Sequence, residues 1–273
     1  MSASAPASGP RIAVFGLGEA GGSIAADLVG RGAQVHAFDP APRPTPAGVT
    51  RHATPSTAVE HAVAVLAVTA SADAETAVLQ ALDDIPDRAV YADLSTASAE
   101  HKRRLARLAD RRSLAFADVA LMSTVKGSGL ATPQLASGPG ATGYAALVRD
   151  LGAQVEVIGD RPGDAATRKL LRSVVTKGLA ALLIEALRGA TEAGLSAWAW
   201  EHFASELTSL DEAFLRRLVE GTGPHAERRQ HEMAAASQLL ADLGVEPCMT
   251  DATVESLRAV RTHPPPALPD AGP

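Results

Sequence analysis

A glycine-rich loop between an apolar strand and a helix is the feature that most constrains this chain. The run Arg11–Phe15 is short and largely apolar, which is typical of a buried strand. An alanine-rich segment from Ala20 to Gly30 follows and has the composition of a helix. The loop between them has the pattern G-x-G-x-x-G and consists of Gly16, Leu17, Gly18, Glu19, Ala20 and Gly21. Strand, glycine turn and helix in this order predict a unit that binds a dinucleotide.

Each glycine of the loop has a predicted task. Gly16 is expected to make the tight turn, Gly18 to let the backbone approach a pyrophosphate, and Gly21 to let the helix pack against the strand. The helix N-terminus offers unpaired N–H groups and a partial positive charge to the phosphates. We therefore predict that the loop binds the pyrophosphate of a nicotinamide dinucleotide.

An acidic residue follows the second predicted strand. That strand, Gln34–Phe38, ends at Asp39, which is close to the expected position of an acid that binds the adenosine ribose. A carboxylate repels a 2′-phosphate, so Asp39 favours NAD over NADP. Arg43 lies in the next loop and can attract that phosphate, so NADP stays an alternative. The predicted cofactor-binding residues outside the loop are Asp39, Thr69 and Ser95.

The pattern of apolar and helical segments in the sequence changes near residue 160. Before that point, apolar runs alternate with helical segments; the runs are 11–15, 34–38, 62–68, 89–92, 114–117 and 154–158, and the helices are 20–30, 72–82, 97–110 and 142–151. Runs that are apolar throughout indicate strands covered on both faces. The alternation predicts an α/β fold with a doubly wound parallel sheet, the Rossmann arrangement.

After residue 160 the strand pattern stops and helical patterns continue to about residue 260. The predicted helices are 164–193, 197–207, 209–219, 224–243 and 250–260. The first of them is apolar around most of its circumference, which is typical of a helix inside a larger assembly, so we expect a homodimer. The predicted organisation is a disordered segment 1–10, an NAD(P)-binding Rossmann domain 11–160, an all-helical substrate and dimerisation domain 161–262, and a Pro-rich, disordered tail 263–273.

Composition excludes several function classes. With a net charge of −6 and only 3% aromatic residues, the chain is not expected to bind nucleic acid. No apolar run approaches the ~20 residues needed to cross a bilayer, so no membrane association is expected. The single cysteine, Cys248, cannot form an internal disulfide, and the first residues lack the pattern of a signal peptide, so we predict a cytoplasmic location. The histidine spacings predict no metal site.

Four segments carry a resemblance to a known family. They are Phe15–Gly21, Asp93–Thr96, Phe116–Ala120 and Gly163–Ala186. Together they resemble the β-hydroxyacid dehydrogenase superfamily, which includes 3-hydroxyisobutyrate and 6-phosphogluconate dehydrogenases. The resemblance implies hydride transfer between nicotinamide and a small hydroxy acid or its carbonyl, at a cleft between the two domains.

The resemblance also implies a catalytic lysine. In the family, five residues separate a glycine from that lysine, and a Glu-Ala pair follows on the same helix. Gly163, Lys169 and Glu185–Ala186 stand in these positions. Lys169 is therefore the predicted general acid/base. Lys177 lies on the same helix face two turns later and is the alternative.

The residues expected to contact substrate depart from the family. Arg172 and Ser173 stand where the family has paired asparagines, and a Met-Ser-Thr sequence replaces its Ser-Gly-Gly loop. In these departures the chain resembles a divergent branch of the superfamily, whose members have a C-terminal domain of unknown function. Lysines, hydroxyls and an arginine near one helix face suit a small anionic substrate. The candidate substrate residues are Ser95, Thr96, Met122, Ser123, Thr124, Arg172 and Ser173.

Two alternative functions remain open at this stage. Imine reductases use the same two-domain frame, although a retained lysine favours alcohol or carbonyl chemistry. The replaced substrate loop also allows a non-catalytic dinucleotide-binding sensor.

Overall fold

The computed structural model describes residues 9–270, and its contacts divide the chain into two compact units. The first ends at Arg172 and the second begins at Ser173. Of the segments expected to be disordered, residues 1–8 and 271–273 lie outside the described residues.

The described part of the first unit contains an eight-stranded sheet with the order β3-β2-β1-β4-β5-β6-β7-β8. β6 and β7 are antiparallel, whereas the other neighbouring strands are parallel. The strands are β1 Arg11–Phe15, β2 Gln34–Phe38, β3 Thr50–Arg51, β4 Ala64–Ala67, β5 Val90–Asp93, β6 Ala115–Leu121, β7 Gln134–Ser137 and β8 Val155–Gly159. The predicted doubly wound α/β fold is confirmed.

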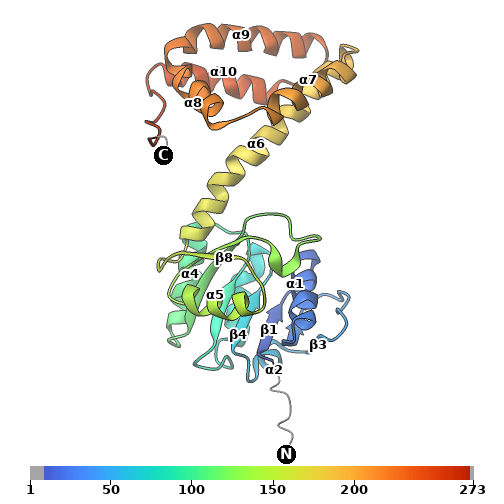
Figure 1. Ribbon diagram of the computed structural model, residues 1–273, viewed down its shortest axis with the longest axis vertical. Helices are drawn as coiled ribbons and strands as arrows, with labels where there is room; N and C mark the ends of the chain where they lie inside the picture. Colours follow the sequence, from blue (N-terminus) through green and yellow to red (C-terminus); the bar gives the residue numbers. More distant parts are fainter. Residues whose placement is uncertain (1–8, 271–273) are drawn as a thin grey trace, which may run out of the picture. The chain divides into compact units, whose positions relative to one another are not determined.

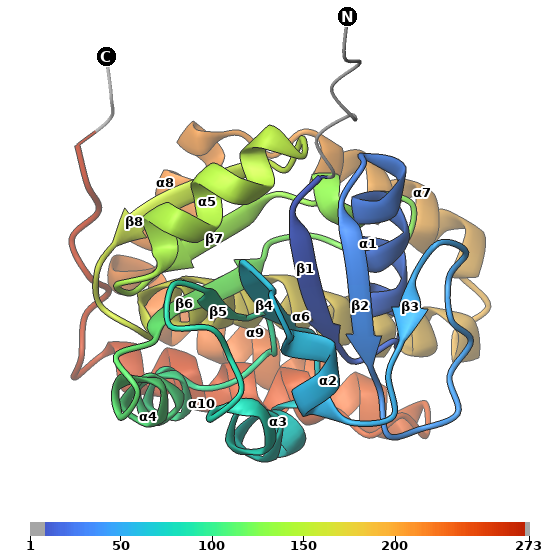
Figure 2. The same cartoon turned by 90° about the horizontal axis from the view of Figure 1, so that it is seen from below.

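Helices cover both faces of this sheet (Figure 2). α1 and α5 pack on one face around Ile24 and Tyr144, and α2, α3 and α4 pack on the other around Val78 and Leu105. These helices are α1 Glu19–Gly30, α2 Pro55–Val59, α3 Ala74–Ala81, α4 Ala99–Asp110 and α5 Ala141–Asp150, with short 3-10 turns η1 Ser71–Asp73 and η2 Gly129–Ala131. Because both faces are covered, the central strands are apolar at nearly every position.

The sheet has more strands than the sequence predicts. β3 is only two residues long, and β7 carries a polar residue at each end, Gln134 and Ser137. Both of these side chains are buried, and the Tyr144 hydroxyl donates to Gln134 Oε1 at 2.6 Å. A hydrophobic pattern cannot reveal a strand whose buried polar groups are paired by residues distant in sequence.

The second unit is helical, as predicted. α6 Asp164–Glu192 runs into it from the first unit, and α7 Ser196–Thr208, α8 Glu212–Glu220, α9 Thr222–Asp242 and α10 Cys248–Val260 follow. Figure 1 shows α9 and α10 side by side. Residues 264–270 form neither helix nor strand, but Arg216 donates to the Pro269 carbonyl at 2.6 Å. No helix of residues 9–270 is both long enough and apolar enough to span a membrane.

Glu185 fastens α6 to the start of α10. Its carboxylate accepts hydrogen bonds from the Met249 N–H at 2.7 Å, the Thr250 N–H at 2.9 Å and the Thr250 hydroxyl at 2.7 Å. Burial raises the pKa of Glu185, but these hydrogen bonds outweigh burial and hold the pKa below its ordinary value. An ionised Glu185 thus serves as the N-terminal cap of α10.

We expect Glu185→Gln to lower the free energy of unfolding at pH 7 by about 1–3 kcal/mol, because a charged acceptor is lost. The lowered pKa means that this stability is present at neutral pH and disappears as the pH falls from about 5 to about 3. Urea unfolding at several pH values measures both effects.

The matched control is Glu192→Gln, because Glu192 is an exposed residue of the same helix. Equal stability of the two variants at pH 7 contradicts the capping role of Glu185.

Candidate functional site

The backbone of the glycine loop leaves no room for side chains at two positions. Gly16 has φ +90°, and a Cβ there would lie 2.5 Å from the Val68 carbonyl oxygen. A Cβ on Gly21 would lie 2.0 Å from the Gly16 carbonyl oxygen. By contrast, a Cβ on Gly18 would meet no protein atom within 4 Å. Gly16 and Gly21 therefore shape the loop, and the backbone at Gly18 faces open space.

Asp39 fixes the conformation of this loop. One carboxylate oxygen accepts the Leu17 N–H at 2.6 Å, and the other accepts the Ala41 N–H at 2.8 Å. The Gly16 N–H donates to the Phe38 carbonyl at 2.9 Å. Asp39 therefore lies beside the glycine loop, where its spacing in the sequence predicts it.

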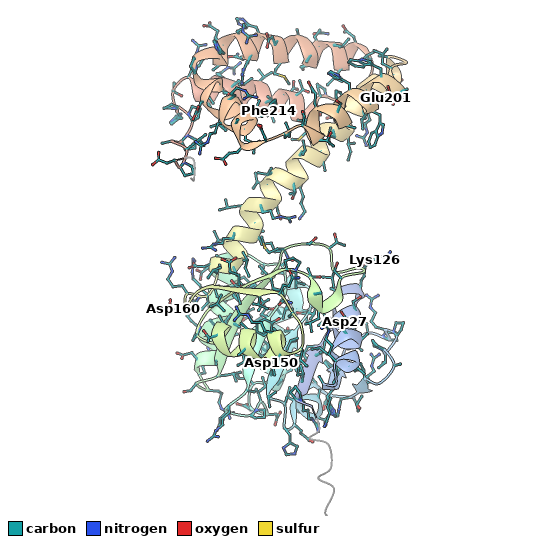
Figure 3. All side chains as sticks on the ribbon, in the orientation of Figure 1. Asp27, Lys126, Asp150, Asp160, Glu201 and Phe214 are labelled. Carbon is teal, nitrogen blue, oxygen red and sulfur yellow. The ribbon has the colours of Figure 1, made fainter. Side chains whose placement is uncertain are left out.

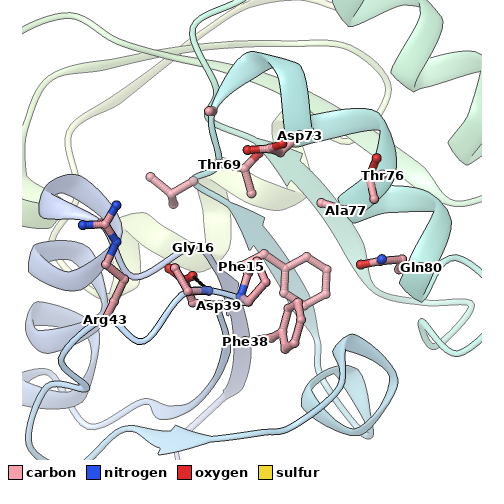
Figure 4. A pocket seen from close by; sticks show the side chains of 15 residues that line it. Phe15, Gly16, Phe38, Asp39, Arg43, Thr69, Asp73, Thr76, Ala77 and Gln80 are labelled. Carbon is pink, nitrogen blue, oxygen red and sulfur yellow. Dashed lines mark hydrogen bonds between the residues drawn. The ribbon is translucent and has the colours of Figure 1, made fainter.

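A cavity of about 480 Å³ opens beside Asp39 (Figure 4). The Phe15 and Phe38 rings meet edge to face on its apolar side, with centroids 6.3 Å apart. Its lining also includes Gly16, Gly18, Asp39, Arg43, Thr69, Asp73, Thr76 and Gln80. An aromatic floor beside a carboxylate suits a flat ring attached to a hydroxylated sugar.

A second cavity, of about 380 Å³, contains most of the other predicted residues. Within it, Lys169 Nζ donates to Thr96 Oγ1 at 2.9 Å. Its lining includes Gly18, Glu19, Ala20, Gly21, Thr69, Leu94, Ser95, Thr96, Leu121, Ser123, Val125 and Lys169. Gly18 and Val68–Ala70 line both cavities, so the two adjoin at the glycine loop. We call the two cavities together the groove.

The residues at this junction fit a dinucleotide. Thr69 Oγ1 is buried, and within the described residues it has no hydrogen-bond partner, although both cavities border it. A buried hydroxyl without a partner is costly, so Thr69 points to a polar ligand atom. The open space at Gly18 lies beside it, at the start of α1, whose first turn has no side-chain cap. Two cavities joined at a glycine loop match the two ends and the pyrophosphate of a dinucleotide.

Ser95 presents an acceptor rather than a donor to the second cavity. Its hydroxyl donates to Asp93 Oδ2 at 2.9 Å, and its backbone N–H donates to Asp93 Oδ1 at 3.2 Å. Because the hydroxyl proton is engaged, Ser95 Oγ has only its lone pairs to offer to a ligand in this cavity. Ser95 therefore suits a ligand hydroxyl or amide N–H better than a carboxylate.

Some predicted substrate residues are not brought into this cavity. Leu121, Ser123 and Val125 line it, whereas Met122 lines a separate cavity with Pro133 and Arg149, and the exposed Thr124 is not part of its lining. Substrate contacts for Met122 and Thr124 therefore stay a prediction.

The later candidates on α6 are not placed in this cavity either. Arg172 is not in the lining of either cavity at the glycine loop, and Ser173 and Lys177 belong to the second unit. Their approach to substrate stays a prediction.

The segment after β6 is held by α1. Asp27 lies on α1 (Figure 3), and its carboxylate accepts the Leu130 N–H at 2.9 Å. A Cβ on Gly129, which has φ +48°, would collide with Asp27. The loop that carries Ser123 is therefore anchored at its far end.

A buried charged cluster, which the sequence did not reveal, lies beneath the second cavity. Lys102 is 1% exposed, and its Nζ donates to Asp93 Oδ2 at 2.7 Å and to the Asp93 carbonyl at 2.9 Å. Nζ also lies 3.4 Å from Asp118 Oδ1, which has no hydrogen-bond partner in the described residues, so this second contact is electrostatic. Asp93 in turn holds Ser95.

The same cluster anchors the start of α6. Asp118 Oδ2 accepts the backbone N–H groups of Gly163 and Ala166, each at 3.0 Å. Asp118 therefore fixes the helix that carries Lys169, while Asp93 fixes the loop that carries Ser95 and Thr96. The available sequence signal was a lysine on the apolar face of α4, in line with Leu105 and Ala109.

Comparisons with known proteins agree with this geometry. Residues 11–157 match the family model described as the NAD binding domain of 6-phosphogluconate dehydrogenase. Residues 190–260 match a second model, described as a domain of unknown function (DUF1932). The first match contains the glycine loop, Asp39, Thr69 and Ser95.

Individual relatives resemble the chain at moderate to low identity. An uncharacterized 28.5 kDa protein of Methanothermus fervidus is 27% identical over 173 residues. The match covers 61% of this chain and 64% of that protein, so the chain spans less than two thirds of this relative's length. The conserved protein MTH1747, described as structurally similar to 3-hydroxyacid dehydrogenases, is 28% identical with a TM-score of 0.59 over 92% of this chain and 97% of that one. A reductive aminase of Aspergillus terreus, solved with NADPH and ethyl levulinate, is 17% identical with a TM-score of 0.77 over 94% of this chain and 95% of that one, which shows the fold alone.

We expect Lys102→Met to lower the free energy of unfolding by about 3–5 kcal/mol, because two buried carboxylates lose their cation. Urea unfolding measures this loss, with Lys126→Met at an exposed position as control. Adding Asp93→Asn to Lys102→Met should recover part of the loss. A loss below about 1 kcal/mol contradicts the role of this cluster.

Proposed function

Because the chain belongs to the family of the 6-phosphogluconate dehydrogenase NAD-binding domain, we propose that it is an NAD(P)-dependent oxidoreductase acting on a small hydroxy acid or the corresponding carbonyl. The observation that carries this proposal is the contact between Lys169 and Thr96 in a cavity shared with the glycine loop. A proton-transfer group and a dinucleotide-binding loop in one cavity are the two elements that hydride chemistry needs.

Lys169 is the proposed general acid/base. When bound, the nicotinamide ring accepts or supplies the hydride. During alcohol oxidation the C–H hydrogen leaves as that hydride, and the neutral Lys169 amine takes the hydroxyl proton as the carbonyl forms. During reduction the Lys169 ammonium returns the proton to the oxygen. Thr96 orients Lys169 by accepting its hydrogen bond, and Ser95 accepts a hydrogen bond from cofactor or substrate.

The substrate is proposed to be small and anionic. In its protonated form Lys169 is a cation at this cavity, and Arg172, Ser173 and Lys177 follow it along α6. In this proposal residues 11–160 bind the cofactor, and residues 161–262 complete the substrate site and form the dimer. Neither nucleic acid nor membrane is a partner, and the protein acts in the cytoplasm.

Imine reduction is the second candidate. The similarity in fold to a reductive aminase supports it, and the same cavity accommodates either chemistry. A lysine beside the glycine loop favours alcohol or carbonyl substrates, because it exchanges a proton with an oxygen. A dinucleotide-binding sensor is the alternative if no substrate is turned over.

A panel of hydroxy acids, ketoacids, amines and cyclic imines, followed by NAD(P)H absorbance, separates these functions. The proposal predicts turnover of a hydroxy acid or its carbonyl. Turnover confined to imines supports imine reduction, and absence of turnover together with intact cofactor binding supports the sensor.

With an active substrate in hand, Lys169→Ala should reduce kcat about 10²–10⁴-fold while leaving the NAD(P)H dissociation constant unchanged. Thr96→Ala should cost about tenfold, because Lys169 loses a positioning hydrogen bond. Lys177→Ala is the matched variant on the same helix. If Lys177→Ala abolishes turnover and Lys169→Ala does not, Lys177 rather than Lys169 is the general acid/base.

The helical unit is also proposed to form a homodimer. Val174 and Val175 of α6 are 71% and 68% exposed in the single chain. Trp198 and Trp200 of α7 are 58% and 65% exposed, so they do not belong to the core of this chain. Large exposed apolar side chains of this kind are typical of a subunit interface.

Sedimentation or size-exclusion measurements should therefore show a dimer. Val175→Asp should shift the equilibrium toward monomer, because it places a charge in the proposed interface. The exposed Lys126→Met variant is the control and should remain dimeric. A wild-type monomer at micromolar concentration contradicts this proposal.

A further inference from the structure

The segment Asp39–Thr45 carries both side chains that bear on the choice between NAD and NADP. Asp39 and Arg43 line the cavity of about 480 Å³ (Figure 4), and they have opposite charge. A carboxylate favours a free 2′-hydroxyl, whereas a guanidinium favours a 2′-phosphate. The balance between them depends on where this segment places each group.

This segment cannot hold its own shape through backbone hydrogen bonds. It begins Asp-Pro-Ala-Pro-Arg-Pro-Thr, and a further proline follows at position 46. Proline has no N–H group, so most carbonyls of the segment find no donor among their neighbours. Within it, the Ala41 N–H donates to Asp39 and the Arg43 N–H donates to the Ala41 carbonyl.

Arg51 supplies further donors to the carbonyls of this segment. Its Nη2 donates to the Asp39 carbonyl at 2.7 Å and to the Ala41 carbonyl at 2.5 Å, and its Nη1 donates to the Arg43 carbonyl at 2.5 Å. Arg51 is itself fixed, because it belongs to β3 and pairs in register with Ala37 of β2. One guanidinium thus ties three alternate carbonyls of the segment to the edge of the sheet.

We propose that Arg51 is the positioning residue that sets the preference between NAD and NADP, by holding Asp39 and Arg43 in fixed places. Arg51 contacts the backbone of the segment, so it acts through these two side chains. The planar fork of arginine matches three carbonyls in a way that a single ammonium does not. This inference rests on the cofactor binding of the proposed function and is independent of the substrate.

Removing the clamp has a definite consequence for the cofactor. In wild type Asp39 is held at the cavity, so NADH should bind more tightly than NADPH. Without Arg51 the segment samples several conformations, Asp39 leaves its place part of the time, and Arg43 becomes free to follow a 2′-phosphate. NADH binding should weaken and NADPH binding should not, so the preference shrinks.

The experiment compares dissociation constants of NADH and NADPH for the full chain, by calorimetry or by the fluorescence of the reduced cofactor. Arg51→Met keeps the aliphatic stem, and we expect it to reduce the NADH preference about tenfold. Arg51→Lys should give an intermediate preference. Arg43→Ala should raise the preference for NADH, because it removes the cation that attracts the phosphate.

Arg112→Met is the matched control. Arg112 also clamps a loop, through the carbonyl and carboxylate of Asp83, but neither residue lines either cavity of the groove. Its variant should keep the wild-type preference whatever its melting temperature.

The proposal is overturned if Arg51→Met weakens both cofactors equally or leaves both unchanged, and also if wild type prefers NADPH. If the wild-type protein binds neither cofactor, both the proposed function and this inference are wrong. If wild type binds NADH and Arg51→Met leaves the ratio of the NADH and NADPH dissociation constants unchanged, only this inference is wrong.

Discussion

The Gly16 carbonyl oxygen lies only 2.0 Å from the place that a Cβ of Gly21 would take, and this close approach of two backbone segments determines the rest of the site. It brings α1 against β1 and leaves Gly18 facing open space. Asp39 holds the loop from the neighbouring strand through the Leu17 N–H. The two cavities join at this point, so the loop divides the groove into a part beside Asp39 and a part beside Lys169.

The second half of the groove depends on a buried charge rather than on a close backbone approach. Lys102 joins Asp93, which holds the Ser95 loop, to Asp118, which caps the start of α6. Lys169 and Thr96 come from these two elements and meet at 2.9 Å. The geometry of the proposed acid/base is therefore set by residues that do not themselves face the groove. This role explains why a lysine that is 1% exposed occurs in a largely apolar core.

Local patterns in the sequence were sufficient for the fold class and for the prediction of a dinucleotide cofactor, but not for β3 and β7. The glycine spacing and Asp39 could be predicted because their roles follow from a single strand-turn-helix unit. Lys102 and Arg51 could not be predicted, since their partners are carboxylates and carbonyls that only the folded sheet brings close. Met122 and Thr124 were predicted to contact substrate from a family loop; neither lines the cavity that contains Ser123 and Lys169, and their role stays a prediction. Lys169 was assigned through the family register, and the structure places it beside the glycine loop, where its catalytic role stays a prediction.

The central claim is that the glycine loop binds a nicotinamide dinucleotide at Gly18, and calorimetric titration of NADH into wild type and Gly18→Val tests it most directly. A side chain at Gly18 meets no protein atom, so the variant should keep its melting temperature within about 2 °C. That side chain enters the space of the pyrophosphate, so binding should weaken by more than about tenfold. Saturable binding to wild type with loss in the variant is the predicted result. Equal binding by both proteins, or no binding of NADH and NADPH by wild type, contradicts the account.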